Sequence, residues 1–141
     1  MLPFPLLQQH TFPFPNLKFL KHKIDLGAEY IVTQMFFNNK KYFEFVDKCR
    51  EAGINVPIIP GIKPITAKSQ ANILPTIFHI DLPEELADEV EKCKDNTAVR
   101  EVGIKWAVQQ SKELMKFGIP TLHFYSMGKS DPIYRIAKQL F

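Results

Sequence analysis

Two kinds of apolar pattern alternate along the chain: amphipathic helical repeats and short continuous runs. The spacing i, i+3, i+4, i+7, which gathers apolar side chains on one face of a helix, is followed by Tyr42, Phe45, Val46 and Cys49. Asn38 or Asn39 precedes this repeat and suits the N-cap position. The pattern therefore predicts a helix that begins after one of these two asparagines.

Signals for the start of a helix occur at two further places. Asp131 and Pro132 suit the N-cap and the first position of a final helix, whose apolar face repeats at Ile133, Ile136, Ala137 and Leu140. Asp81 followed by Glu84 has the spacing of a capping box that opens the segment LPEELADEVEKC. Both predictions rest on neighbouring residues alone.

Three short runs rich in Ile, Val and aromatic residues each follow a helical segment and a glycine. The glycines fall where the end of a helix needs a residue that tolerates positive φ; they and the runs are Gly27 with AEYIVTQMFF, Gly53 with INVPIIPGI and Gly118 with IPTLHFYSM. Because the runs are apolar on both faces and alternate with helices, they predict parallel strands joined by right-handed crossovers. The predicted order is α-β-α-β-α-α-α-β-α, an α/β fold.

Three strands are too few for a complete fold of this class. A closed α/β barrel needs eight strands, and an open doubly wound sheet usually has about five or more. A sheet of three parallel strands leaves long apolar edges. We therefore expect an incomplete domain over residues 16–141, preceded by a leader at residues 1–15 that fits neither pattern and is unrelated or disordered.

Composition and charge restrict the classes of function. The 141-residue chain is 45% hydrophobic and 23% charged, as expected of a globular protein with one core, and no apolar run reaches the roughly 20 residues of a membrane span. The net charge of +3 is mild and the lysines alternate with acids, so no nucleic-acid partner is expected. Cys49 and Cys93 show neither a disulfide framework nor a ligand spacing with the histidines, which favours reduced thiols, no metal site and a cytoplasmic location.

Gln34 is a polar residue in the first strand-like run, YIVTQMFF. Strict alternation along a strand predicts that it shares a face with Val32 and Phe36. A buried amide costs about 1–3 kcal/mol unless its oxygen and its NH2 group find partners. Two interpretations stay open: a glutamine satisfied by neighbouring backbone, or a glutamine that meets a ligand.

Further polar residues follow the other runs, where ligands collect in α/β folds, at the C-terminal ends of the strands. Gln70 lies in a helix expected after the Pro60-Gly61 turn, and Lys129 can meet an anionic group of a ligand. His123 and Tyr125 have side chains suited to acid–base chemistry. For each of these residues a solvated or structural role stays open, and the residues alone indicate no reaction.

Four motifs occur in order over about 120 residues: GAEYIVTQMFF, AGINVPIIPGIKPI, KDNTAVREVGIKWAVQQSKELM and LHFYSMGKS. Through them the chain, from about Leu17 onward, resembles the C-terminal part of the methylenetetrahydrofolate reductase family. The family implies a TIM (β/α)8 barrel, of which this chain would hold the last three β/α units, with extra helices before the final strand. It also implies FAD as cofactor, which passes a hydride from NADH or NADPH to 5,10-methylenetetrahydrofolate and gives 5-methyltetrahydrofolate.

The resemblance implies roles for three polar residues at the strand ends. Gln34 matches a glutamine that contacts the folate substrate, and its amide can both donate to and accept from a pterin edge. Gln70 matches a second substrate-contacting glutamine. Lys129 stands where arginine is common, which keeps the charge and loses the bidentate fork.

For the cofactor, the resemblance points to the helix before the GAEYIVTQ run. Lys23 matches a lysine that serves the anionic portion of FAD, while Asn16 stands where aspartate is common and His22 where arginine is common, so a weakened flavin site is expected. The catalytic residues of the family lie on its first five strands, and no residue here matches them.

Three interpretations follow from the resemblance. The first is a truncated reductase that is inactive as this chain alone. The second is the C-terminal partner of a split reductase, completed by a separate N-terminal half, and the third is a non-catalytic module that binds folate or a partner protein. Association into a homo-oligomer and the choice between NADH and NADPH stay open in all three.

Overall fold

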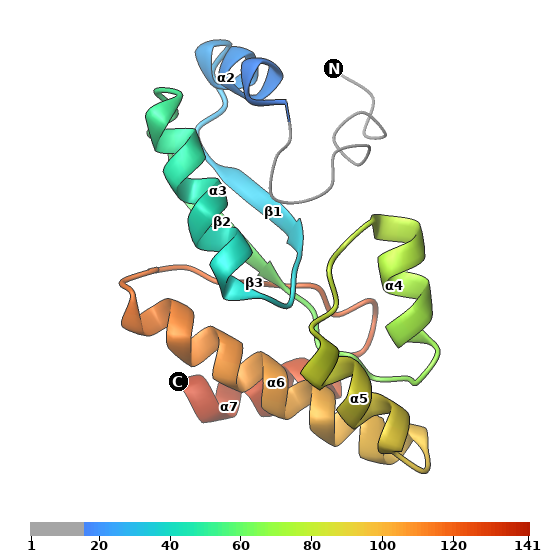
Figure 1. Ribbon diagram of the computed structural model, residues 1–141. Helices are drawn as coiled ribbons and strands as arrows, with labels where there is room; N and C mark the ends of the chain where they lie inside the picture. The colour runs from blue at the N-terminus through green and yellow to red at the C-terminus, as the bar shows by residue number, and fades with distance from the viewer. Residues whose placement is uncertain (1–15) are drawn as a thin grey trace.

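The computed structural model describes residues 16–141, and the predicted leader at residues 1–15 lies outside that range. The described residues form three strands and six helices, whose arrangement can be followed in Figure 1. In chain order they are α2 (Leu17–Asp25), β1 (Ile31–Met35), α3 (Asn39–Glu51), β2 (Ile58–Ile62), α4 (Gln70–Phe78), α5 (Glu84–Lys92), α6 (Asn96–Lys116), β3 (His123–Phe124) and α7 (Ser130–Leu140). The predicted order of helices and strands is confirmed.

The three strands form one parallel sheet in the order β1-β2-β3. β1 pairs with β2 in the register Ile31 to Ile58, and β2 pairs with β3 in the register Ile62 to Phe124. Strands that neighbour in the sequence thus neighbour in the sheet, and helices make each crossover. This arrangement confirms the predicted α/β class and parallel sheet, and it is consistent with part of a TIM barrel.

One face of the sheet is covered by helices. Ile31, Ile58, Ile62 and Phe124 of this face pack with side chains of α3, α6 and α7 in the larger apolar cluster of the described residues. Ile62 of β2 and Leu114 of α6 are fully buried there, and in Figure 1 α3 runs along the sheet while α6 and α7 lie side by side below it. Burial of this apolar surface is the main stabilising contribution to the domain.

The other face of the sheet is incompletely covered by the described residues. Val32 of β1 alternates with Ile31 and is 37% exposed, Ile59 is partly buried, and His123 at the start of β3 is exposed. A second apolar cluster closes only the lower end of this face, where Met35 and Tyr125 pack with side chains of α4, α5 and α6. The sheet therefore has one face buried under helices and one face that is partly exposed.

The helix ends confirm some sequence predictions and correct others. Asn38 is the N-cap of α3, and its side chain accepts a hydrogen bond from the Lys40 N–H. α7 begins at Ser130 with Lys129 as its cap, so the N-cap prediction for Asp131 is wrong and Asp131 lies in the first turn. Gly27, Gly53 and Gly118 all have positive φ, as predicted for the residues after α2, α3 and α6.

The predicted capping box before α5 is also wrong. Pro83 is the N-cap and makes no side-chain hydrogen bond there. The Asp81 carboxylate instead lies 3.6 Å from the Lys41 ammonium at the start of α3. Attraction to a lysine that is distant in sequence thus replaces the local cap. None of the described helices combines the length and apolar character needed to cross a membrane.

Candidate functional site

The C-terminal ends of the three strands meet at one edge of the sheet. Gln34 lies near the end of β1, Lys63 follows β2 directly, and Tyr125 follows β3 directly. The Tyr125 N–H donates to the Ile62 carbonyl, which continues the β2–β3 pairing past the assigned strand. All three strands therefore present polar side chains at the edge where ligands collect in parallel sheets.

Tyr125 ties the three strands together across Gly61. Its hydroxyl donates to the Thr33 carbonyl of β1 at 2.8 Å, and the Gly61 N–H donates to the Thr33 Oγ1 at 3.0 Å. A Cβ at position 61 would lie 2.6 Å from both the Thr33 carbonyl oxygen and the Tyr125 ring, so this crossing needs a glycine. Burial raises the pKa of Tyr125, and with its proton donated to backbone the residue serves as a brace here.

β1 has a bulge immediately before its end. The register with β2 shifts between Val32 and Met35, so side chains do not alternate strictly through Thr33 and Gln34. As a result Phe36 packs in the helix-covered cluster while Val32 is exposed on the other face. The prediction that Gln34, Val32 and Phe36 share one face is therefore wrong, because it assumed an unbroken strand.

Gln34 is half-buried, and its Oε1 accepts a hydrogen bond from the Met35 N–H at 3.0 Å. The interpretation of an amide satisfied by neighbouring backbone is confirmed for the oxygen. Its NH2 group makes no hydrogen bond within residues 16–141, so both of its N–H donors are available to a ligand. The structural and the ligand-binding interpretations are thus compatible at Gln34.

Gln70 is the first residue of α4 and closes the loop after β2. Its Oε1 accepts from the Thr66 N–H at 2.8 Å, and its Nε2 donates to the Thr66 Oγ1 at 3.3 Å. Thr66 itself is buried, so these bonds fix the loop that carries Gln70. One N–H of the amide is left for a ligand, fewer than at Gln34.

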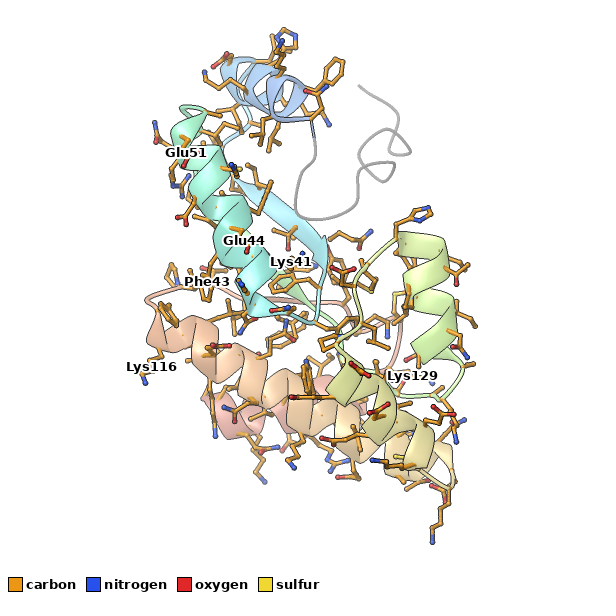
Figure 2. All side chains as sticks on the ribbon, viewed as in Figure 1. Lys41, Phe43, Glu44, Glu51, Lys116 and Lys129 are labelled. Atoms are coloured by element: carbon orange, nitrogen blue, oxygen red, sulfur yellow. The ribbon has the colours of Figure 1, made fainter. Side chains whose placement is uncertain are left out.

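Two lysines lie on the segments that follow β2 and β3, Lys63 directly after β2 and Lys129 before α7. Lys129 is exposed on the loop before α7, and Figure 2 shows it on the side towards which β1 points, far from Lys116 at the end of α6. Lys63 is only 5% exposed, and its Nζ donates to the Pro64 carbonyl at 3.2 Å. Burial lowers the pKa of Lys63, and the positive charge of Lys129 lowers it further. Lys63 was not among the site residues predicted from the sequence, although a lysine inside the apolar run IPGIKPI is a signal for a buried charge.

The residues predicted for the flavin lie elsewhere. His22 and Lys23 are in the last turn of α2, and Asn16 caps its start by accepting a hydrogen bond from the Lys18 N–H. Figure 1 shows α2 at the end of the sheet where β1 begins, opposite the strand ends that carry Gln34. The three predicted substrate residues thus lie in β1 or on the segments that follow β2 and β3, and the three predicted cofactor residues lie on or beside α2 at the other end of β1.

α6 also supports the strand ends, which sequence reading did not anticipate. The Trp106 indole N–H donates to the Phe37 carbonyl at 3.0 Å, and the buried Gln110 Nε2 donates to the Phe36 carbonyl at 2.8 Å. These bonds hold the backbone just past β1 against α6. Their signal in the sequence is the i, i+4 spacing of Trp106 and Gln110 on one face of a long helix.

Comparison with known proteins places the chain in a family. The family model described as "Methylenetetrahydrofolate reductase" matches residues 7–141, and this match begins inside the predicted leader. A relative named methylenetetrahydrofolate reductase 1 from Schizosaccharomyces pombe is 38% identical over 89% of this chain and 21% of its own length. The 5,10-methylenetetrahydrofolate reductase of Escherichia coli is 34% identical over 86% of this chain and 41% of its own. The chain thus spans about a fifth to two fifths of the length of the relatives it matches.

A solved structure shares the fold. It is described as an uncharacterized protein from Clostridium thermocellum that binds two copies of 5-methyl-5,6,7,8-tetrahydrofolic acid. The alignment has a TM-score of 0.54 and 19% sequence identity, and it covers 87% of this chain and 46% of that one. At this identity the likeness supports the α/β architecture alone.

Proposed function

This chain belongs to the methylenetetrahydrofolate reductase family, and we propose that it forms the folate-binding part of a reductase barrel. The observation that supports the proposal is that Gln34 lies near the end of β1 while Gln70 and Lys129 lie on the segments that follow β2 and β3 of the same parallel sheet. In this proposal the three strands are the last three of a TIM barrel. The complete barrel reduces 5,10-methylenetetrahydrofolate to 5-methyltetrahydrofolate with NADH or NADPH as donor.

In the proposed site the folate lies across the strand ends. The NH2 group of Gln34 and one N–H of Gln70 donate to acceptors on the pterin edge. Lys129 adds a positive charge on the loop before α7, suited to an anionic part of the ligand. These residues bind and orient the substrate, and no proton-transfer residue is proposed from this chain.

FAD supplies hydride transfer in the family, and the residues of α2 fit one part of it. His22 and Lys23 form no ion pair with described residues, so both side chains can contact the diphosphate of the cofactor. The Asn16 oxygen already caps α2, which leaves its NH2 group to donate. We propose these three residues as peripheral flavin contacts, with most contacts made by a part of the barrel that this chain does not supply.

The open face and the edges of the sheet favour a complementing part over an independent module. Val32 and His123 on this face are exposed, and β1 and β3 are both edge strands within the described sheet. Unpaired strand edges of this kind are usually covered or protected in stable proteins. We therefore propose that further strands, on the same polypeptide or on a separate chain, close the barrel, and that the chain alone does not catalyse the reaction.

The first experiment is a calorimetric titration of the purified chain with 5-methyltetrahydrofolate. Gln34→Ala is compared with Gln109→Ala, a control glutamine exposed on α6. We expect Gln34→Ala to weaken binding about tenfold, the effect of one lost hydrogen bond to a polar ligand, and Gln109→Ala to leave it unchanged. A folded chain that does not bind this folate would overturn the proposal.

Gel filtration after incubation with FAD separates the alternatives. We expect no flavin absorbance to elute with the chain, since most cofactor contacts lie outside it. A retained flavin spectrum would instead mean that residues 16–141 form a flavin site of their own, and the chain would then be assayed for reductase activity.

A second variant experiment uses a complete barrel. There Gln34→Ala is expected to slow reduction of the folate far more than reduction of the flavin by the nicotinamide donor, because Gln34 meets only the folate. Stopped-flow absorbance resolves the two half-reactions. Equal losses in both would remove the substrate role assigned to Gln34.

A further inference from the structure

Lys63 is a buried cation that the proposed folate contacts do not use. It follows β2 directly and is 5% exposed, and its ammonium donates to the carbonyl of its neighbour Pro64 at 3.2 Å. An ammonium has three N–H donors, so two N–H groups of Lys63 have no acceptor among the described residues. Burying a charge in this state is costly unless an anion compensates it.

No acidic side chain of the described residues supplies that anion. The three ion pairs within residues 16–141 join Lys21 to Asp25, Lys41 to Asp81 and Arg135 to Glu101, and none includes Lys63. The charged group that acts on Lys63 is a second cation, Lys129. Lys63 directly follows β2 and Lys129 lies on the segment after the neighbouring strand β3, so both belong to the edge of the sheet where ligands collect.

The start of α7 adds to the positive potential. Lys129 occupies the N-cap of this 11-residue helix and makes no side-chain capping bond, so N–H groups of the first turn are not capped by it. The positive end of a helix dipole favours an anion. Asp131 in the first turn carries the opposing charge, but its side chain is exposed.

We propose that Lys63 and Lys129 form an anion-binding pair for a carboxylate of the ligand, with Lys129 at the surface and Lys63 buried behind it. Lysine acts as a compact point charge on a flexible stem, so the Lys63 ammonium can leave the Pro64 carbonyl for a ligand oxygen. This inference rests on the proposed function, because a folate ends in the carboxylates of its glutamate. It adds to that function a specific requirement for the anionic end of the substrate.

The test uses p-aminobenzoylglutamate, the anionic end of a folate without its pterin. The full chain is labelled with 13C at the lysine ε-carbons, and the titration midpoint of Lys63 is followed by NMR with and without this probe. We expect the probe to raise the midpoint of Lys63, since a bound carboxylate stabilises the charged amine. Lys129→Met, at an exposed position, should also raise the midpoint in the free protein by removing the like charge.

Calorimetry on variants completes the test. Lys63→Met and Lys129→Met should each weaken binding of p-aminobenzoylglutamate about tenfold, as expected for a lost bond to a charged group. Lys116→Met is the control, because Lys116 lies at the far end of α6 (Figure 2). It should bind the probe as the unmodified chain does.

The outcomes separate this inference from the proposed function. If 5-methyltetrahydrofolate binds while the probe leaves the Lys63 midpoint unmoved and Lys63→Met binds normally, the anion pair is overturned and the folate function stands. If inorganic phosphate raises the midpoint and neither folate ligand does, the pair binds phosphate and the carboxylate assignment is overturned together with the folate function. If none of these ligands binds, both proposals fail.

Discussion

Two tyrosines, one on each face of the sheet, make the same kind of bond in different surroundings. On the helix-covered face, the Tyr42 hydroxyl donates to the Ile58 carbonyl at 2.6 Å, and the residue is 1% exposed. On the other face, the Tyr125 hydroxyl donates to the Thr33 carbonyl at 2.8 Å, and the half-buried ring lies edge-on to the exposed His123. Tyr42 is therefore buried in a fully packed core, whereas Tyr125 lies at the edge of the partly exposed face.

The difference indicates where the chain is complete. On the helix-covered face every strand contributes a side chain to a single apolar cluster, so that face needs nothing further. On the other face the exposed Val32 and His123 remain, and Gln34, Lys63 and Lys129 lie at or after the C-terminal ends of the three strands. A parallel sheet normally has both faces covered, so the open face is the one that a complementing part and a ligand would occupy.

The largest contrast is expected from truncating one apolar side chain on each face. Ile62→Ala removes a fully buried side chain of β2 and should lower the free energy of unfolding by about 2–5 kcal/mol. Val32→Ala on the open face should change it by only about 0.5 kcal/mol. Urea unfolding of both variants measures the contrast, and equal losses would mean that the open face is packed as tightly as the covered one.

The two tyrosines give a smaller contrast. Tyr42→Phe leaves the Ile58 carbonyl without its donor in a dry core and should cost about 1–3 kcal/mol. Tyr125→Phe leaves the Thr33 carbonyl near the open face, where water can replace the hydroxyl, so the cost should be under about 1 kcal/mol. If Tyr125→Phe proved the costlier change, the brace across Gly61 would contribute more than the covered core.

The dependence of stability on alkaline pH tests the helix-covered face, first in the unmodified chain and then in a variant. Burial raises the pKa of Tyr42 to about 12 from the ordinary value of 10.0. Between these two values the folded state holds a proton that the unfolded state has lost, so the stability contributed by Tyr42 is present below pH 10.0 and is lost as the pH rises towards 12. Tyr42→Phe should reduce this loss in unfolding curves recorded across the window. An unchanged loss would assign it to other groups.

The sequence was sufficient for the order of elements and insufficient for the details of the site. Helical spacing and apolar runs are local signals, so the parallel α/β arrangement followed from them. The bulge between Val32 and Met35 depends on the register with β2, which the sequence of β1 does not contain. The expected cap at Asp81 failed for a similar reason, since Lys41 attracts its carboxylate from another element.

The glutamines show the same limit at the candidate site. The resemblance selected Gln34 and Gln70, which lie near the end of β1 and at the start of α4 after β2. The bonds they make to Met35 and Thr66 depend on backbone geometry and could not be read from residue types. Lys63 stands in the apolar run IPGIKPI, which is a signal for burial, but the degree of its burial depends on packing between distant elements.

The smallest predicted effect concerns Lys63, and it tests the difference between the helix-covered face and the open face of the sheet. Its pKa in the folded state is lowered, first by burial and then by Lys129, so the unfolded state binds more protons between that lowered value and 10.5. The contribution of Lys63 to stability should therefore not change with pH below that window and should rise as the pH passes through it, the opposite sign to Tyr42. Lys63→Met should flatten this rise and stabilise the chain modestly at neutral pH, as measured by urea unfolding at about pH 7 and pH 9.5. A less stable Lys63→Met chain with an unchanged pH slope would mean that the ammonium already has an anionic partner in the folded protein, and that the open face is less open than the contrast requires.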